Sequence, residues 1–181
     1  MDVCKERGFE SLRCDCLSVP LRDDVADACI CIAVIHHLAT EDRRLRAIKE
    51  IVRILKPGGS ALIYVWAQDQ FSNNQKSNYI KDDKKQDVQI NTENFQSEIS
   101  IVEGVPLPVH TNRTQFKNKD LLVPWKLKRN SENKGTFLRF YHVYAEHELE
   151  KVCENLNNVE IISNYYDQGN WCVMIQKINN S

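Results

Sequence analysis

Residues 40–67, TEDRRLRAIKEIVRILKPGGSALIYVWA, decide the fold class of this chain of 181 residues. Apolar residues recur in it at steps of three and four, which places them on one face of a helix; they are Leu45, Ile48, Val52 and Leu55. Thr40 is a suitable N-cap, and Pro57 with the two glycines after it predicts the helix end and a reversal of the chain. The run ALIYVW that follows lacks polar alternation, as is typical of a strand covered on both faces in a parallel sheet. The stretch therefore predicts an α/β fold.

Upstream of this unit, two further runs have the length and composition of strands. Residues 26–35, ADACICIAVI, form one, and residues 9–16 form the other, which closes on Asp15. Strands that alternate with helices imply right-handed crossovers and a doubly wound sheet, whose ligands bind at the carboxyl ends of the strands. We expect Asp15, the pair His36 and His37, and Trp66 at such ends.

The second half of the chain predicts a polar insertion and an antiparallel ending. Residues 70–104 are rich in Asn, Gln, Ser, Lys and Asp, and we expect them to form a disordered insertion. Residues 146–156 have the pattern of a helix, and residues 159–166 and 170–177 that of two strands joined by the hairpin turn Asp-Gln-Gly. The prediction is a single domain over residues 1–181 that ends in an antiparallel hairpin.

Basic and aromatic side chains gather in residues 109–142. Eight Lys or Arg residues occur there against two acidic residues, with five aromatic residues among them. The whole chain is balanced, with 24 basic and 25 acidic residues, which excludes a global affinity for polyanions and makes any nucleic-acid surface local. An ordinary solvated face explains these charges as well as phosphate binding does; the phosphate-binding candidates are Lys117, Lys126, Lys128 and Arg129.

Cysteine usage and hydropathy bear on the compartment. Seven cysteines, an odd number, indicate reduced thiols rather than a disulfide framework. The pairs Cys14/Cys16 and Cys29/Cys31 lie within strand-like runs, where core packing is a better interpretation than a zinc site. No signal peptide opens the sequence, and no apolar run approaches the ~20 residues of a membrane span. We expect a soluble protein without membrane attachment, in the cytoplasm or also in the nucleus.

Several motifs carry a resemblance to a known family. The strand closing on Asp15, the run DACICIAVIHHLAT, the LKPGG turn and the strand after it are similar to the second half of a class I S-adenosylmethionine-dependent methyltransferase. VPW at 123–125, RFYHVY at 139–144 and YYDQGNW at 165–171 narrow the resemblance. Together these motifs resemble the eukaryotic tRNA methyltransferases that esterify 5-carboxymethyluridine at the wobble position, in particular the methyltransferase domain of the AlkB-homologue tRNA enzymes.

This resemblance implies a Rossmann-like fold, S-adenosylmethionine as cofactor, tRNA as substrate and a small zinc-binding activator protein as partner. Such enzymes hold the methionine part of the cofactor with a GxGxG loop after their first strand. The chain has six glycines and no Gly-x-Gly, so we interpret it as truncated at the N-terminus. The resemblance retains the adenine end of the site, with Asp15 and Cys16 at the adenine, Ala33 and Val34 near the methionine part, and His37 at the adenine edge. The competing interpretation is that Asp15 only ends a strand and that the histidine bonds local backbone.

The implied reaction is transfer of a methyl group to a carboxylate, which is already ionised at neutral pH and needs no general base. The protein must place that carboxylate in line in a dry pocket and hold its second oxygen with a donor. The catalytic candidates are Arg139, His142 and Trp125, and the substrate-binding candidates are Arg113, Lys126, Lys128, Asn170 and Trp171. Core packing competes with this role for Trp125, and a surface role competes with it for Arg139.

Two functions remain open from the sequence. The first is a tRNA methyltransferase that uses S-adenosylmethionine to esterify the wobble nucleoside. The second is a catalytically inactive truncated isoform that keeps only the binding of tRNA or of a partner protein. Because the Gly-x-Gly loop is missing, we expect weak cofactor binding by this chain, and a measurement of cofactor affinity separates the two functions.

Overall fold

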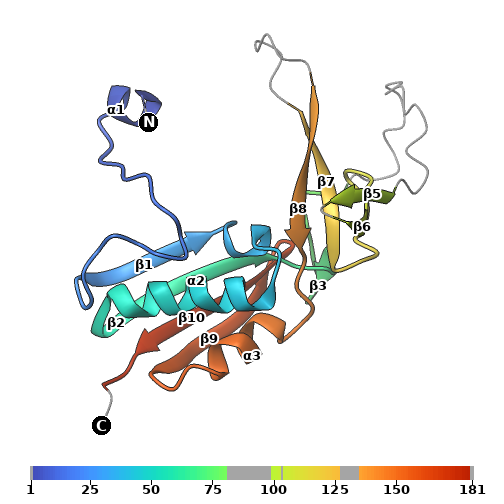
Figure 1. Ribbon diagram of the computed structural model, residues 1–181. Coiled ribbons are helices and arrows are strands. Elements are labelled where there is room, and N and C mark those ends of the chain that lie inside the picture. The colour runs from blue at the N-terminus through green and yellow to red at the C-terminus, as the bar shows by residue number, and fades with distance from the viewer. Residues whose placement is uncertain (1, 81–98, 103, 127–134, 180–181) are drawn as a thin grey trace.

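The computed structural model describes residues 2–80, 99–102, 104–126 and 135–179. A four-stranded sheet lies at its centre; the strand order is β1 (Ala26–Ile32), β2 (Leu55–Trp66), β10 (Asn170–Lys177) and β9 (Val159–Asp167) (Figure 1). β1 and β2 run parallel, whereas β10 is antiparallel to both β2 and β9. The predicted α/β class and its C-terminal antiparallel hairpin are confirmed.

Two helices cover one face of this sheet (Figure 1). α2 (Glu41–Ile54) begins at Thr40, whose Oγ1 accepts a hydrogen bond from the Arg43 N–H at 3.3 Å, as expected for an N-cap. α3 (Glu148–Glu154) lies on the same side. Both helices and the central strands share one core, which includes Ile48, Ile51, Val52, Ala61, Ile63, Val65, Leu149, Cys153, Val173 and Ile175. Within the described ranges, no helix is long and apolar enough to cross a bilayer.

The opposite face of the sheet carries apolar side chains that are bare. Ile30 and Ile32 of β1 are 72% and 54% exposed, and Tyr165 of β9 is 40% exposed. The strand register pairs Ile32 with Tyr64, Tyr64 with Cys172 and Cys172 with Tyr165, so these side chains share one face. Both α2 and α3 lie on the other face, so neither covers them.

α2 ends at Ile54, before Pro57, and β2 begins at Leu55. The register with β1 then jumps from Leu55 to Ser60, and Gly58 has a φ of 81°, so the chain makes an irregular turn at the predicted Pro-Gly-Gly. Gly59 lies against the backbone of β1. A Cβ at Gly59 would stand 2.9 Å from the carbonyl oxygen of Lys56 and 3.0 Å from that of Asp27. This glycine is therefore required for the close approach of two backbones rather than for a turn.

Residues 9–16 contain no strand, although the structure describes all of them, and the prediction for this segment is wrong. α1 (Asp2–Glu6) and the chain after it extend away from the sheet (Figure 1). Phe9 and Leu12 are 63% and 61% exposed. The apolar pattern favours a strand, but a strand also needs a partner for its backbone groups, and in the described sheet β1 pairs with β2 alone.

A second group of strands projects from the carboxyl ends of β1 and β2. β7 (Asp120–Lys126) and β8 (Thr136–His142) form an antiparallel hairpin whose outer half stands clear of the sheet (Figure 1). β5 (Ile99–Val102) and β6 (Val105–Pro108) pair with each other beside β7. The 3-10 helix η1 (Ile35–His37) contacts β8 and so joins this hairpin to the end of β1.

Residues 70–80 are ordered, so the predicted disordered insertion over 70–104 is wrong for this part. Two short strands pair here, β3 (Phe71–Ser72) and β4 (Gln75–Lys76). Gln70 is 2% exposed, and its Nε2 donates to the carbonyl oxygens of Ala67 at 2.7 Å and Gly169 at 3.1 Å. Polar composition therefore accompanies order here, because a side-chain amide satisfies buried carbonyls. The predicted insertion also includes β5, which is paired with β6. Its remaining residues, 81–98 and 103, lie outside the described residues.

Candidate functional site

The chain turns sharply where β1 ends. Ala33 has a φ of 58°, a left-handed conformation that costs a non-glycine residue about 1 kcal/mol. Its N–H donates to the carbonyl oxygen of Tyr64 at 3.2 Å, which extends the pairing of β1 with β2 by one bond. The turn then sends the chain into η1. Such strained positions cluster at functional sites, and this one lies at the carboxyl end of a parallel strand.

His36 of η1 is the buried histidine of the pair at this turn. It is 1% exposed, and its Nδ1 accepts a hydrogen bond from the Trp66 N–H at 3.3 Å, so the proton of the neutral ring belongs on Nε2. The ring stacks on Tyr141 at a centroid distance of 4.9 Å and an interplanar angle of 16°. Burial, with smaller contributions from His37 and His142, lowers the pKa of His36 to about 3. His36 is therefore a neutral ring at physiological pH.

Seven ring side chains meet at the carboxyl ends of β1 and β2, and we call them the ring cluster: His36, His37, Trp66, Tyr79, His110, Phe116 and Tyr141. Trp66 is central, with centroids 4.9 Å from Tyr141 and 5.1 Å from Tyr79. Tyr79 stacks on Phe116 at 5.5 Å and 6°. The exposed His37 packs edge-on against Tyr141 at 4.4 Å, with its Nδ1 3.1 Å from the carbonyl oxygen of Phe140. The cluster forms an apolar, water-poor wall at the edge of the sheet where α/β folds bind ligands.

The residues expected to contact the cofactor come from the chain before β1, for the adenine end, and from the turn after β1, for the methionine part. Asp15 is exposed, and its Oδ1 accepts the Leu17 N–H at 2.9 Å. Cys16 packs against the main core, and burial, with the neighbouring Asp15 charge, raises the pKa of its thiol. Ala33 and Val34 are exposed at the end of the strand. A carboxylate can accept from an exocyclic amino group, so the exposed Asp15 is chemically compatible with the adenine end of S-adenosylmethionine, and its Oδ1 also accepts within its own turn, as the competing interpretation expects.

His142 is held between two carboxylates. It is 4% exposed, with Nδ1 2.7 Å from Asp120 Oδ1 and Nε2 2.7 Å from Glu148 Oε1. Burial by itself would raise the pKa of Glu148, but hydrogen bonds from His142 and Lys119 lower it to about 2. Both ring nitrogens of His142 are thus used to join β7 and β8 to α3, and neither is left for the substrate carboxylate of our sequence-based expectation.

Trp125 and Arg139 lie together on the outer half of the β7–β8 hairpin. The guanidinium carbon of Arg139 is 4.0 Å from the centroid of the Trp125 ring. Trp125 is 37% exposed, and Arg139 is exposed as well. Burial raises the pKa of the Tyr141 phenol, and the adjacent Arg139 opposes that rise. Arg139 is therefore placed next to the ring cluster, through Tyr141, with a guanidinium that is free of the carboxylate pairs that hold His142.

The substrate-binding candidates fall in different places. Arg113 lies 6.0 Å from the centroid of the Tyr79 ring and so borders the ring cluster. Lys126 is exposed on the hairpin, and Lys128 lies outside the described residues. Asn170 Nδ2 donates to the carbonyl oxygen of Asp167 at 3.0 Å, and Trp171 is 5% exposed within the main core. These last two residues therefore shape the β9–β10 hairpin in this structure.

Sequence reasoning named several members of the ring cluster but not their meeting. It placed both histidines and Trp66 at the strand ends and chose His37 for the cofactor, whereas the pairing of His36 with the backbone of β2 depends on a contact between distant segments. Tyr141 carries a readable signal, because it alternates with Arg139 along a strand and must share its face. No signal identifies Tyr79 and Phe116, since they come from irregular segments that meet only in the folded chain.

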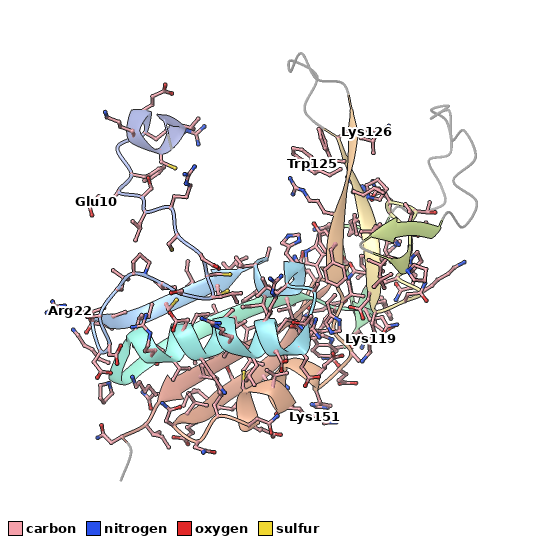
Figure 2. All side chains as sticks on the ribbon, in the orientation of Figure 1. Glu10, Arg22, Lys119, Trp125, Lys126 and Lys151 are labelled. Carbon is pink, nitrogen blue, oxygen red and sulfur yellow. The ribbon has the colours of Figure 1, made fainter. Side chains whose placement is uncertain are left out.

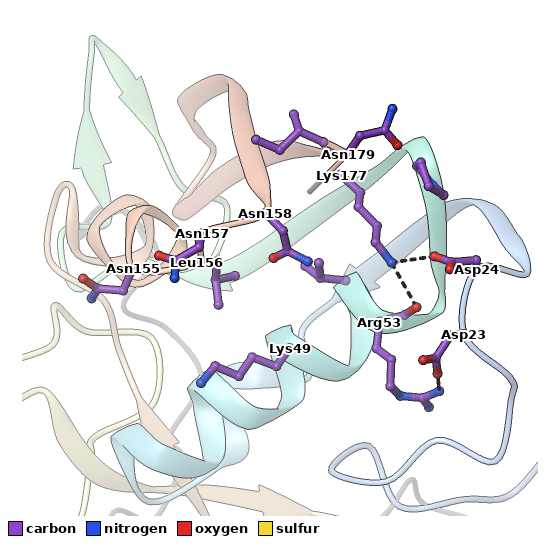
Figure 3. Close-up of a pocket in the computed structure, with 13 residues that line it drawn as sticks. Asp23, Asp24, Lys49, Arg53, Asn155, Leu156, Asn157, Asn158, Lys177 and Asn179 are labelled. Atoms are coloured by element: carbon purple, nitrogen blue, oxygen red, sulfur yellow. Dashed lines mark hydrogen bonds and ion pairs between the residues drawn. The ribbon is translucent and has the colours of Figure 1, made fainter. Parts of the chain in front are cut away.

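A cleft of about 590 Å³ lies at the amino ends of β1 and β2 (Figure 3). Two of the three cations that line it are paired. Lys177 Nζ donates to Asp24 Oδ1 at 2.7 Å and to the Leu55 carbonyl at 2.8 Å, and Arg53 Nη1 to Asp23 Oδ1 at 2.6 Å. The third cation is Lys49 of α2. The carboxyl edge remains the candidate site, because α/β folds bind ligands there.

Comparison with known proteins gives what the chain is similar to. A sequence profile described as a methyltransferase domain matches residues 1–63. The tRNA (carboxymethyluridine(34)-5-O)-methyltransferase alkbh8 of Xenopus tropicalis is 45% identical over 194 residues, which cover 98% of this chain and 30% of that protein. ALKBH8 of Macaca fascicularis is 41% identical over 226 residues, which cover 98% and 34%. A crystal structure of an S-adenosylmethionine-dependent methyltransferase from Clostridium acetobutylicum ATCC 824 has a TM-score of 0.58 at 12% identity and covers 98% of this chain and 69% of that chain.

The structural likeness and the sheet topology define the class: this is the fold of class I S-adenosylmethionine-dependent methyltransferases. Within that class, the chain is similar along 98% of its length to tRNA (carboxymethyluridine(34)-5-O)-methyltransferases, so the resemblance inferred from its motifs is confirmed. The chain spans about a third of the length of these two relatives.

Proposed function

We propose that this chain acts in the transfer of a methyl group from S-adenosylmethionine to the carboxylate of 5-carboxymethyluridine at the wobble position of tRNA. The similarity to wobble-uridine methyltransferases over 98% of the chain carries this proposal. The ring cluster supports it, since it lies at the carboxyl edge of the sheet and directly follows Ala33 and Val34 in the chain.

The chemistry suits a site without a general base. A carboxylate with a pKa of about 4 is ionised at physiological pH and can attack the methyl group directly. The cofactor supplies an electrophilic methyl group on a positively charged sulfur. Because the two opposite charges disappear as methyl transfer proceeds, the water-poor ring cluster does not oppose the reaction. A neutral His36, whose pKa is lowered to about 3, adds no competing charge to this wall.

Particular residues take the remaining tasks in this proposal. Asp15 and Cys16 hold the adenine end, and Ala33 and Val34 line the methionine side. Arg139 holds the second carboxylate oxygen, because it is a cation placed beside Tyr141 of the ring cluster. Charge-assisted hydrogen bonds of this kind both orient the nucleophile and exclude water from it.

Partners and location extend the proposal. We propose tRNA as the substrate, a small zinc-binding methyltransferase activator protein as partner, and the cytoplasm, with the nucleus as a further location. The names of the relatives support the tRNA. The partner rests on the resemblance described above, and co-purification of the chain with a small protein that contains stoichiometric zinc tests it.

Methyl transfer tests the function directly. The purified chain is incubated with S-adenosylmethionine labelled in its methyl group and with tRNA that carries 5-carboxymethyluridine. We expect label only in this tRNA, released as methanol by mild alkali, because the product is an ester. The same tRNA with unmodified uridine is the matched control and should remain unlabelled. Alkali-stable label would contradict esterification and show that another atom is methylated.

The second candidate function is an inactive chain that binds RNA. One observation favours it: the sequence contains no Gly-x-Gly to hold the methionine part of the cofactor. In that case calorimetry detects no S-adenosylmethionine binding and the assay gives no label, while tRNA binding persists. A micromolar dissociation constant for the cofactor, about −8 kcal/mol, would exclude this candidate.

A further inference from the structure

One face of the β7–β8 hairpin is buried at its base and bare at its outer end. The strand register pairs Leu121 with Tyr141 and Trp125 with Phe137, so all four side chains lie on the same face. Leu121 and Tyr141 are 2% and 9% exposed and pack in the second core cluster. Trp125 and Phe137 are 37% and 47% exposed. An aromatic surface thus continues outward from the ring cluster along a hairpin that nothing else in the described chain covers (Figure 2).

Trp125 is exposed but held in place. Arg139, opposite Val123 in the register, packs its guanidinium carbon 4.0 Å from the Trp125 ring centroid. Phe137 contacts the same indole with a centroid distance of 6.0 Å. Such contacts lower the entropy that the indole would lose on binding, because its rotamer is already restricted. The hairpin therefore presents a preorganised ring rather than a loosely attached one.

The charge around this ring points to the chemistry of its partner. The described residues of the outer hairpin, 123–126 and 135–140, include Lys126 and Arg139 and no carboxylate. Aromatic faces accompanied by cations are the combination that binds unpaired nucleotides, because bases stack on the rings and phosphates attract the cations. Figure 2 shows Trp125 and Lys126 on the part of the hairpin that stands clear of the sheet.

We propose that the outer β7–β8 hairpin is a base-stacking arm, in which Trp125, braced by Arg139, stacks on an unpaired base of the RNA substrate. This inference rests on the proposed function for the identity of the RNA. From Phe137 to Tyr141 the strand spans about 14 Å, so a base on the arm and a base at the ring cluster belong to the same loop. The arm thus selects an unpaired loop before any chemistry occurs, and Trp125 acts in binding rather than in methyl transfer.

Affinity for an unmodified RNA hairpin with an anticodon loop, measured by anisotropy without cofactor, tests the arm. Trp125→Ala should weaken binding about 5- to 100-fold, since a stacked base contributes this much. Trp125→Phe should keep part of the affinity. Phe71→Ala is the matched control, because Phe71 is a 61% exposed aromatic residue on β3, and its affinity should equal that of the unchanged chain. Equal thermal midpoints and circular dichroism exclude unfolding as the cause.

Indole emission gives a second readout that a structural role would not change. The RNA should quench emission from the unchanged chain more than from Trp125→Phe, which keeps the indoles of Trp66 and Trp171, and the affinity for a fully paired RNA duplex should be insensitive to Trp125→Ala. Wild-type affinity in Trp125→Ala overturns the inference, and so does equal quenching in both proteins. Loss of binding to a protein partner with RNA affinity intact would also overturn it and assign the arm to that partner. If stacking is found but no ester is formed, the arm stands and the proposed function falls.

Discussion

The surroundings of His36 disfavour the protonated, charged form of its ring. Its ring is stacked on Tyr141, its Nδ1 accepts the Trp66 N–H, and burial lowers its pKa to about 3 from an ordinary value of 6.5. A histidine with a lowered pKa binds its proton more readily in the unfolded chain. The stability it contributes is therefore fully present above pH 6.5 and is lost as the pH falls toward 3.

Replacement of His36 should flatten this pH dependence. His36→Phe keeps a ring for the stack on Tyr141 but cannot titrate, so between pH 6 and pH 4 the variant should lose about 2 kcal/mol less stability than the unchanged chain. Urea unfolding at a series of pH values measures the difference. Parallel stability profiles for the two proteins would contradict a buried neutral His36. The variant will be less stable at pH 7, because the Trp66 N–H loses its acceptor.

Glu148 fastens the hairpin to α3 by charge. Its Oε1 lies 2.7 Å from His142 Nε2, and its Oε2 accepts a hydrogen bond from Lys119 Nζ at 2.7 Å. These hydrogen bonds hold the pKa of Glu148 at about 2 despite burial. Glu148→Gln removes the charge at constant size and should cost about 2 kcal/mol at pH 7, measured by urea unfolding. Glu146→Gln, at a side chain that is 60% exposed, is the control and should have little effect. Because the pKa of Glu148 is lowered, the difference should vanish as the pH falls from 4.5 toward 2.

At the scale of elements, the sequence patterns predicted the helices, strands and turns that depend on interactions between residues close in the chain. The periodicity of α2, the apolar run of β2 and the Asp-Gln-Gly turn between β9 and β10 all specify structure within about 15 residues, and the structure has all three. Residues 9–16 have an equally apolar pattern and form no strand, because a strand depends on a partner that local sequence does not supply. Residues 70–80 look disordered by composition but are ordered by contacts with a turn about 90 residues away.

The docking of residues 70–77 on the β9–β10 turn depends on a missing side chain. A Cβ on Gly169 would stand 2.5 Å from Gln70 Oε1 and 2.6 Å from Ser77 Oγ, at a φ of 93°. Gly169→Ala should therefore cost about 2 kcal/mol or more, from strain in the turn and displacement of these polar side chains. Gly104→Ala is a matched control, since Gly104 has a φ of 83° but nothing within 4 Å. Thermal unfolding that ranks the two variants equally would show that docking contributes little.

At the scale of the whole molecule, the site could be predicted as a place but not as a set of residues. Alternation of strands and helices predicts that the carboxyl ends of β1 and β2 hold the site, and the ring cluster lies there. The partners of each side chain come from segments far apart in the chain, such as Asp120 and Glu148 on either side of His142. A motif such as RFYHVY indicates which residues share a face of a strand. It cannot indicate which of these side chains form hydrogen bonds with distant residues of the chain.

The bare face of the sheet leads to a prediction about association. Ile30 and Ile32, 72% and 54% exposed, lie on β1, which is an edge strand of the described sheet. Exposed apolar edges favour pairing with a second copy, because pairing buries apolar surface and satisfies open backbone groups. We therefore expect the isolated chain to form dimers or larger species at increasing concentration, and the double variant Ile30→Lys, Ile32→Lys to behave as a 21.0 kDa monomer. Light scattering after size-exclusion chromatography measures both. The control is Val105→Lys, at an apolar residue of β6 that is 56% exposed, and this variant should associate like the unchanged chain. If the unchanged chain stays monomeric at every concentration, the exposed face of β1 does not drive association.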